Sequence, residues 1–401
     1  MTTRTDLLEI IANGENSGVE FKRDDLQTQE LAKELVAFSN LEGGIVILGV
    51  EDDGAVSGLV RAADLEGWVM SVCRDKIRPP VVPFFEKVCA VDEDKDVAII
   101  RVTRGYDVHA LWHNSSNRYL LRVGTQSREA SGEELARLFQ QRGSIRAELQ
   151  PVSGATIAHL DMRRLRNYFG AIRQQDIPDN EDADAWQSLL VNTEVMTEEG
   201  VTVGGMLLFG KTPNRFLPHA GIDAVAYPGQ EQDYDAQERG ELRGPMTPLY
   251  DINNNIVENG LVEQALDFVQ RNTRKTTKLD GGRRVERPVY PTEVLREGIV
   301  NALIHRDYLL TSTDIELAIY SHKLEIISPG RLPNGITPAR MRAGTRAARN
   351  QILKDVMRDY QYLEHMGMGI PRKILKGMKE HNGTEPDLIE RDERFIIRLF
   401  S

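Results

Sequence analysis

The sequence predicts an α+β fold in which two functional modules are joined by an α/β segment. In the N-terminal part, the alternation of Val19–Lys22 is typical of a strand, and an amphipathic helix over 27–40 and a buried strand over 44–50 follow it. In the C-terminal part, a buried helix over 291–305 precedes two alternating segments within 314–328. With 401 residues, 40% of them hydrophobic, the chain can bury the cores of two or three domains.

The composition limits where the protein acts and what it can bind through bulk charge. Its formal net charge is −11 at pH 7, so a nucleic-acid partner would need a local basic track on an acidic body. The two cysteines, Cys73 and Cys89, have neither metal-ligand spacing nor a disulfide framework. No apolar run approaches the length of a membrane span, and charged residues interrupt the N-terminus. We therefore expect a cytoplasmic protein with no membrane partner.

The N-terminal module, residues 1–145, contains acidic residues at two places where the chain turns. Glu15 and Glu20 flank the turn before the first strand, and Glu51 or Asp53 follows the buried strand, in a D-G hairpin turn. Such a group of three carboxylates can hold one or two divalent cations, which activate water and stabilise the leaving oxygen of a phosphodiester. The alternative is that these residues form ordinary ion pairs and a polar turn.

Several short motifs of this module resemble the Schlafen AlbA domain. They are E-x-S-x-x-E-F-K at 15–22, A-F-S-N-x-x-G-G-x-x-x-x-G-V-E-D-D-G at 37–54 and Y-L-L-R-V-G-T at 119–125. The resemblance covers most of residues 14–142 and implies a nucleic-acid-binding domain, which cleaves RNA in the Schlafen ribonucleases. It implies Glu15, Glu20 and Glu51 as catalytic metal ligands and Lys22 as the group that neutralises a phosphate.

Basic residues at strand and loop positions of the same module supply candidate nucleic-acid contacts. They are Lys22, Arg118, Arg122 and Arg128. Residues 1–140 nevertheless carry 16 Lys/Arg and 24 Asp/Glu, a net charge of −8. Binding to a polyanion must therefore depend on local geometry rather than on overall charge.

The middle segment, residues 155–285, is predicted to be an α/β connector. Its stretch G-M-L-L-F-G-K-T-P-N-R-F-L-P at 205–218 resembles the connector of the same bacterial proteins. Apolar residues at helical spacing predict one long helix over 249–272. The basic stretch 273–287 reads first as a solvated loop, and it also fits an ordered hairpin, a mobile lid or a nucleic-acid contact.

In the C-terminal module, residues 286–401, the helix at 291–305 carries the residues with the clearest chemistry. Glu297, Asn301 and His305 are spaced four residues apart, so they share one face of the helix. A carboxylate, an amide and an imidazole on one face can bind Mg²⁺ and orient a water molecule. The alternative is that these groups cap and hydrogen-bond neighbouring elements.

This helix and two later glycine segments resemble the GHKL ATPases, and more closely the divergent ATPase module of bacterial Schlafen AlbA proteins. The motifs are R-E-G-I-V-N-A-L-I-H-R-D-Y at 296–308, P-G-R-L-P at 329–333 and G-M-G-I-P-R at 367–372. The resemblance implies a GHKL-like α/β sandwich that binds ATP and Mg²⁺. Asn301 would hold the cation and Glu297 would orient or deprotonate the attacking water. The further nucleotide contacts would be His305, Asp307, Gly330, Arg349, Asn350, Gly367 and Gly369. GHKL enzymes usually read the adenine amino group with an Asp in the first loop, where this chain has Ser328 and Pro329.

Together these features indicate an ATP-binding, nucleic-acid-binding regulatory protein that forms a homo-oligomer, a dimer or larger. In this hypothesis, nucleotide occupancy controls the Schlafen-like module. The alternative is a metal-dependent nuclease that cleaves tRNA, single-stranded RNA or DNA during stress or phage defence. A third class is a nucleotide-binding scaffold without a nucleic-acid partner.

Overall fold

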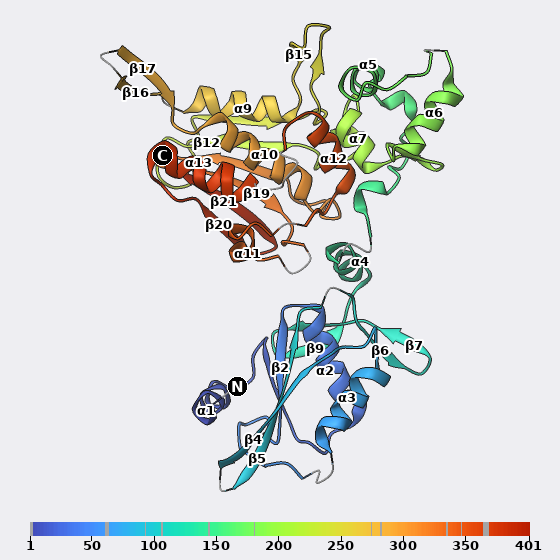
Figure 1. Ribbon diagram of the computed structural model, residues 1–401, viewed down its shortest axis with the longest axis vertical. Coiled ribbons are helices and arrows are strands. Elements are labelled where there is room, and N and C mark those ends of the chain that lie inside the picture. Colours follow the sequence, from blue (N-terminus) through green and yellow to red (C-terminus); the bar gives the residue numbers. More distant parts are fainter. Residues whose placement is uncertain are drawn as a thin grey trace. The chain divides into compact units, whose positions relative to one another are not determined.

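The computed structural model describes residues 3–60, 64–92, 94–105, 107–142, 145–179, 181–273, 275–280, 283–333, 336–345, 347–363 and 369–401. It divides into two compact units, residues 1–145 and 146–401. Each unit combines helices with sheets (Figure 1), which confirms the α+β prediction. No helix within the described residues is long and apolar enough to pass through a bilayer.

The first unit is organised around a four-stranded sheet. Its elements are α1 (Arg4–Asn13), β1 (Val19–Lys22), α2 (Thr28–Asn40), β2 (Gly43–Leu48), α3 (Leu65–Asp75), β3 (Ile77–Arg78), β4 (Phe84–Asp92), β5 (Lys95–Thr103), β6 (Ala110–His113), β7 (Ser116–Arg118), β8 (Leu120–Val123), β9 (Gln126–Glu129) and α4 (Gly132–Gln141). The sheet has the order β1-β2-β5-β4, with β1 and β2 parallel and the other pairs antiparallel. The predicted strands at 19–22 and 44–50 and the predicted helix at 27–40 are confirmed as β1, β2 and α2.

Alternation along the strands separates two hydrophobic clusters in this unit. Val46 and Leu48 of β2 pack in a cluster with residues of α2 and α3, whereas Ile47 packs with Leu7 of α1. Successive side chains of a strand point to opposite faces, so both faces of the sheet are covered by helices. Because the sheet is buried on both faces, the strand that follows α2 reads as the continuous apolar run Ile45–Leu48.

The second unit is built on a six-stranded sheet and one hydrophobic core. Its elements are η1 (Ala147–Leu149), η2 (Ile157–His159), α5 (Met162–Arg166), η3 (Asn167–Ile172), α6 (Ala183–Asn192), β10 (Met196–Thr197), β11 (Gly200–Val201), α7 (Val203–Phe209), α8 (Pro213–Phe216), β12 (Ile222–Ala226), β13 (Glu238–Leu242), β14 (Leu249–Tyr250), β15 (Ile256–Glu258), α9 (Leu261–Asn272), β16 (Lys275–Asp280), β17 (Arg283–Pro288), α10 (Thr292–His305), β18 (Ile315–Ile319), β19 (Lys323–Pro329), α11 (Pro338–Arg342), α12 (Gln351–Asp359), η4 (Gly369–Leu375), α13 (Lys376–Asn382), β20 (Asp387–Arg391) and β21 (Arg394–Phe400). The strand order is β13-β12-β18-β19-β21-β20, so strands from both 155–285 and 286–401 share one sheet.

The strand periodicity gives this sheet one apolar and one charged face. Leu324 and Ile326 of β19 enter the core, and helices α9 and α10 contact strands of the sheet. Glu325 of the same strand points the other way and accepts from Arg398 of β21, with 2.7 Å between Oε1 and Nε. The helices and the ion pairs therefore lie on opposite faces, as in a two-layer α/β sandwich.

One predicted element is wrong. The structure has no helix over 249–260: helix α9 begins only at Leu261, and the short strands β14 and β15 precede it. Asp251 accepts hydrogen bonds from the backbone N–H groups of Asn253 and Asn255, and Asn254 has a positive φ of 62°. Short polar side chains that bond to nearby backbone compete with a helix, and they make a turn here. Ile252, which apolar spacing would place on the buried face of such a helix, is 99% exposed.

Candidate functional site

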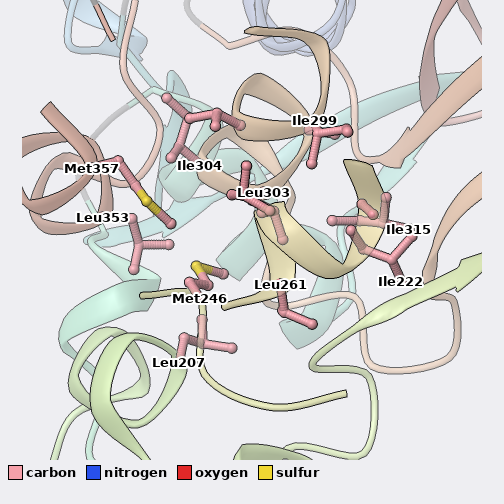
Figure 2. Close-up of a cluster of buried hydrophobic side chains, with 14 of the residues drawn as sticks. Leu207, Ile222, Met246, Leu261, Ile299, Leu303, Ile304, Ile315, Leu353 and Met357 are labelled. Carbon is pink, nitrogen blue, oxygen red and sulfur yellow. The ribbon is translucent and has the colours of Figure 1, made fainter. Parts of the chain in front are cut away.

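Helix α10 presents three polar side chains to a pocket in the second unit. Glu297, Asn301 and His305 all line this pocket, as their four-residue spacing predicts. Residues on the other side of the helix are buried in the core. Figure 2 shows Ile299 and Leu303 of α10 among core side chains. Burial of that apolar surface fixes which face of α10 is turned to the pocket.

The pocket has a volume of about 530 Å³ and a mixed apolar and charged lining. Strands β19 and β21 contribute Ile326, Ser328, Phe395 and Ile397, and the segment after β19 contributes Gly330, Arg331, Leu332, Pro333 and Ile336. Met341, Gln351, Lys354, Arg358 and Gly369 also line it. This volume is in the range of small-molecule and cofactor sites, where a few polar groups orient a largely apolar ligand.

Glu297 and Asn301 form a hydrogen-bonded pair at the pocket wall. The amide Nδ2 of Asn301 donates to Glu297 Oε1 at 2.9 Å and to the backbone oxygen of Glu297 at 2.6 Å. The other carboxylate oxygen, Oε2, lies 3.6 Å from the Nζ of Lys373. Since the amide nitrogen makes these bonds, the amide oxygen of Asn301 is the atom that can coordinate a cation.

Gly369 is required because its backbone lies against the carboxylate of Glu297. A Cβ at position 369 would overlap Glu297 Oε1, so any larger residue would displace this carboxylate from Asn301. The glycine begins the π-helical turn η4 and lines the pocket. Its predicted partner in the same motif, Gly367, lies outside the described residues.

Gly330 occupies the turn at the end of β19 and also lines the pocket. Its φ is +110°, a conformation that favours glycine. A Cβ there would overlap the guanidinium of Arg349 and lie 2.6 Å from the Cβ of Asp307. Beneath this turn, Arg349 Nη1 lies 3.8 Å from Asp307 Oδ2, and its Nη2 donates to the backbone oxygen of Arg331. Arg349 and Asp307 therefore support the glycine turn from behind.

The structure gives Arg349, Asn350 and Asp307 supporting positions rather than places in the pocket lining. Asn350 is fully buried and donates from Nδ2 to the backbone oxygens of Ile304 at 2.8 Å and Arg306 at 2.9 Å. These carbonyl groups belong to the C-terminal end of α10, which has no intrahelical partners for them. Asn350 thus fixes the end of the helix that carries Glu297 and Asn301.

The half-buried His305 is held in its neutral form by its surroundings. Burial, with the nearby positive charges of Arg349 and Lys354, lowers the pKa of His305 to about 4. At neutral pH its imidazole can donate or accept a hydrogen bond without adding charge to the pocket.

The described pocket lining contains no counterpart of the Asp that binds the adenine amino group in GHKL enzymes. Ser328 is buried, and its Oγ donates to the backbone oxygen of Ala302 at 2.9 Å. Glu297 is the one carboxylate among the described lining residues. One of its oxygens accepts from Asn301, and the other lies beside Lys373. A carboxylate that accepts from an exocyclic amino group is therefore absent from the described part of the pocket.

Sequence reasoning missed three cationic residues of the lining, Arg331, Lys354 and Arg358. Lys354 and Arg358 belong to α12, where the apolar residues Ile352, Leu353, Val356 and Met357 already show the amphipathic spacing of a helix. That signal predicts which side of α12 is polar. It does not predict that this side faces a pocket, because the pocket is assembled from segments far apart in the chain.

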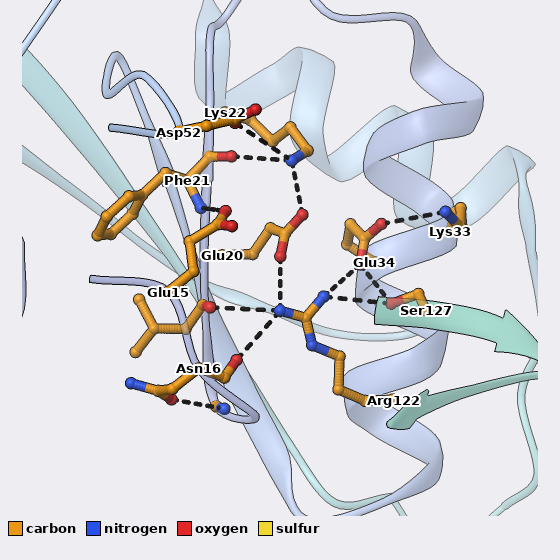
Figure 3. A network of polar contacts seen from close by, with 12 residues as sticks. Glu15, Asn16, Glu20, Phe21, Lys22, Lys33, Glu34, Asp52, Arg122 and Ser127 are labelled. Atoms are coloured by element: carbon orange, nitrogen blue, oxygen red, sulfur yellow. Dashed lines mark hydrogen bonds and ion pairs between the residues drawn. The ribbon is translucent and has the colours of Figure 1, made fainter. Parts of the chain in front are cut away.

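In the first unit, two predicted site residues, Glu20 and Arg122, form a buried ion cluster with Glu34 (Figure 3). The guanidinium of Arg122 lies 2.6 Å from Glu20 Oε2 and 3.1 Å from Glu34 Oε2. Ser127 also donates to Glu34, and Arg122 donates to the backbone oxygen of Asn16 at 3.1 Å. Glu20, Glu34 and Arg122 are each only 5% exposed. Arg122, predicted as a nucleic-acid contact, is therefore an internal partner of two carboxylates.

The three predicted metal ligands do not come together in a form that suits a divalent cation. Both carboxylate oxygens of Glu20 face cations, since Lys22 Nζ lies 2.6 Å from its Oε1. Glu15 accepts from the backbone N–H of Phe21 at 2.9 Å, and Glu51 lies 3.9 Å from Arg23. Among the described residues, no group of three or more His, Cys, Asp or Glu is arranged to hold a metal ion.

A groove of about 930 Å³ runs beside this ion cluster. Its charged lining residues are Glu20, Lys22, Arg23, Asp25, Glu30, Lys33, Glu34, Glu51, Asp52 and Asp53. Burial lowers the pKa of Lys22, but its hydrogen bond to Glu20 and the charges of Glu15 and Asp52 outweigh burial and raise it above the usual value. Lys22 therefore stays protonated and positive beside the groove.

The two remaining predicted contacts, Arg118 and Arg128, are exposed and paired. Arg118 Nη2 lies 3.2 Å from Glu129, and Arg128 Nη2 lies 2.6 Å from Glu134. Neither arginine lines the groove. Of the four predicted contacts, the structure places only Lys22 on the groove wall.

Two family models match separate parts of the chain. The Schlafen, AlbA_2 model matches residues 15–131. The HATPase_c_4 model, described as "Putative ATP-dependent DNA helicase recG C-terminal", matches residues 312–399. The second match begins after α10, so the pocket combines residues of the matched range with Glu297 and Asn301 from the helix before it.

No curated protein matches the chain. Among solved structures, the DIP2311 protein from Corynebacterium diphtheriae is similar over 99% of this chain and 81% of that chain, with 21% sequence identity and a TM-score of 0.44. The family matches agree with the motifs quoted from both modules. The chain thus contains an N-terminal Schlafen AlbA_2 domain and a C-terminal ATPase-like domain, the combination expected of a nucleic-acid-associated, ATPase-type protein.

Proposed function

We propose that residues 146–401 bind a magnesium complex of a nucleoside triphosphate, with ATP as the first candidate, and that occupancy controls nucleic-acid binding by the AlbA_2 domain. The observation that carries the proposal is the pocket itself. It gathers Glu297, Asn301, Gly330 and Gly369, four residues of the nucleotide-type motifs that lie on three separate segments of the chain. A volume of about 530 Å³ suits a nucleotide.

The residues of the pocket fit magnesium nucleotide chemistry. Mg²⁺ in such sites is held by one or two protein oxygens together with phosphate oxygens and water, and it neutralises phosphate charge. The amide oxygen of Asn301 would supply the protein ligand. Glu297 is placed to orient a water molecule or accept its proton. Gly330 and Gly369 allow backbone to approach a phosphate more closely than a residue with a Cβ would.

A physical route for the control runs through helix α12. Residues Gln351, Lys354 and Arg358 of α12 line the pocket. At the start of the same helix, the N–H of Gln351 donates to the carboxylate of Glu148 at 3.0 Å. Glu148 is fully buried, and it belongs to the turn η1, which begins two residues after the end of the first unit at Ile145. A shift of α12 on nucleotide binding would therefore act on the segment that leads to the AlbA_2 domain.

The first test is nucleotide binding measured by calorimetry with Mg²⁺ and ATP. The wild-type chain is expected to bind, and Asn301→Ala is expected to weaken binding of the magnesium complex at least tenfold, because the cation loses its protein ligand. Asn253→Ala, in the exposed turn before β15, is the matched control and should leave affinity unchanged. No affinity of the wild-type chain for any nucleoside triphosphate with Mg²⁺ would refute the proposal.

The second test measures control of nucleic-acid binding. Fluorescence anisotropy with labelled single-stranded RNA, tRNA and duplex DNA would compare the free protein with the protein saturated by the magnesium nucleotide. The expected result is a change in affinity for one of these classes, and loss of that change in Asn301→Ala. If nucleic-acid affinity is the same with and without nucleotide, the proposed control of nucleic-acid binding is refuted, whereas the proposed nucleotide binding is not.

The nuclease alternative finds no support in the ion cluster, because Arg122 and Lys22 occupy the carboxylate of Glu20. We expect no cleavage of these nucleic acids with Mg²⁺ or Mn²⁺. Metal-dependent cleavage by the wild-type chain that disappears in Glu20→Gln, with nucleic-acid binding retained, would restore the alternative.

A further inference from the structure

Helix α12 separates the hydrophobic core from the pocket. Its buried residues are Ile352, Leu353, Val356 and Met357. Figure 2 shows Leu353 and Met357 near Ile304 of α10, within the core. Gln351, Lys354 and Arg358 follow at i, i+3 and i+7, so they form one stripe on the helix, and all three line the pocket. The polar side of α12 is thus a wall of the pocket, on which Gln351 is exposed and Lys354 and Arg358 are half-buried.

This wall is positively charged although the protein as a whole is acidic. The described lining contains the cations Arg331, Lys354 and Arg358 and the single carboxylate Glu297. Arg358 is half-buried and pairs with the neighbouring Asp355, with 2.9 Å between Nη2 and Oδ1. Lys354 makes no ion pair within the described part of the chain. Its charge is close enough to His305 to contribute, after burial and Arg349, to the lowered pKa of that imidazole.

The position of this wall is fixed at the start of α12 by two buried side chains. Asn350, directly before the helix, is bonded to the backbone oxygens at the end of α10. Glu148 accepts from the first N–H of the helix and from Arg146 Nε at 3.1 Å. Lys354 begins the next turn of α12 and lines the same pocket as Asn301 and His305 of α10. A cation on a helix anchored in this way is preorganised for an anionic ligand.

We propose that Lys354 binds the phosphate tail of the nucleotide and that Arg358, one turn further along α12, supports it. The proposal rests on the proposed function and assigns a residue that neither the motifs nor the family models indicate. Lys354 is a compact charge with three N–H donors on a flexible stem, which suits phosphate oxygens. Phosphate binding, which the resemblance assigns to Arg349 and Asn350, would then belong to Lys354. Arg349 and Asn350 are not available for it, because both support the pocket from behind.

The test compares ligands that differ only in their phosphates. Calorimetry would measure ATP with Mg²⁺, ADP with Mg²⁺ and adenosine against the wild-type chain and Lys354→Gln. Loss of a charge-assisted hydrogen bond should weaken ATP binding about 10- to 100-fold. Adenosine affinity should change less than about threefold, because the apolar lining remains intact. Lys354→Arg, which keeps the charge, should recover most of the lost affinity.

Two controls separate a local effect from a general one. Lys379→Gln removes an exposed lysine of α13 that does not line the pocket, and it should bind all three ligands like the wild type. Hydrogen-exchange protection of α10 and β19 should be the same for Lys354→Gln as for wild type, since Lys354 is not part of the hydrophobic core. Equal losses for ATP and adenosine, or no loss for ATP, would overturn the assignment while wild-type binding still supports the proposed function. No binding of any ligand by the wild type would overturn both.

Discussion

Removing Arg122 should destabilise the AlbA_2 domain far more than removing an arginine with an equally short ion pair on the surface. Arg122→Ala leaves the carboxylates of Glu20 and Glu34, each 5% exposed, without their shared cation. Breaking a buried ion pair by removing one partner costs about 3 to 5 kcal/mol. Lys22 stays 2.6 Å from Glu20, so we expect the lower end, about 3 kcal/mol.

Arg128→Ala is the matched control. Its Nη2 lies 2.6 Å from Glu134 Oε1, the same separation as in the pair of Arg122 and Glu20, but the Arg128 side chain is 48% exposed. Exposed ion pairs contribute about 0 to 1 kcal/mol, because water screens the charges and the side chains lose rotamer freedom. The two variants therefore differ in burial and not in the length of the ion pair.

Hydrogen exchange read by mass spectrometry is the suitable assay, because the chain has two units and a single unfolding curve would mix them. In Arg122→Ala, amides of β2 and β5 should exchange about 100-fold faster, which corresponds to about 3 kcal/mol. Amides of β19 and β21 in the second unit should be unchanged, and Arg128→Ala should alter β2 and β5 less than about fivefold. Similar protection of β2 and β5 in both variants would refute the reasoning. It would show that burial of the ion pairs does not determine how much they stabilise the first unit.

Three further predictions concern the second unit. Gly369→Ala should weaken binding of ATP with Mg²⁺ about 10- to 100-fold in calorimetry, because the new Cβ overlaps the carboxylate of Glu297 and a displacement of this kind costs about 1 to 3 kcal/mol. Burial, with the charge of Arg306, lowers the pKa of His219 to about 4, so stability should fall as pH falls from about 6.5 towards 4, by at most about 3 kcal/mol. His219→Leu should remove this part of the acid dependence from the hydrogen-exchange protection of the second unit between pH 7 and pH 4.5. The same loss of protection at pH 4.5 in the variant and in the wild type would contradict it. In Glu148→Ala the first N–H of α12 loses its buried acceptor. Hydrogen-exchange protection of α12 should therefore fall by about 1 to 3 kcal/mol, and nucleotide should have a smaller effect on nucleic-acid binding. Retained protection of α12 would argue against this helix as the route of control.

Local patterns were enough to predict the elements that depend on neighbours in the sequence. The four-residue spacing of Glu297, Asn301 and His305 predicts a shared face, and the structure places all three in one pocket. The strand at 19–22 and the hairpin of β18 and β19 follow from alternation in the same way. The long helix predicted over 249–272 failed because apolar spacing was weighed above Asp251 and the asparagines after it, whose side chains stabilise a turn.

The sequence by itself determined the α+β class, the two motif-bearing modules and the polar face of α10, because each depends on residues within one or two turns of helix or along one strand. Only the tertiary structure decided that Arg122 lies between two buried carboxylates, that Arg349 and Asn350 support the pocket from behind, and that Lys354 faces it. The sequence alone does not distinguish an arginine, asparagine or lysine that is solvated from one that is buried or that lines a site. Their roles are set by which distant segments pack against them, since burial and charge partners arise only when those segments come together.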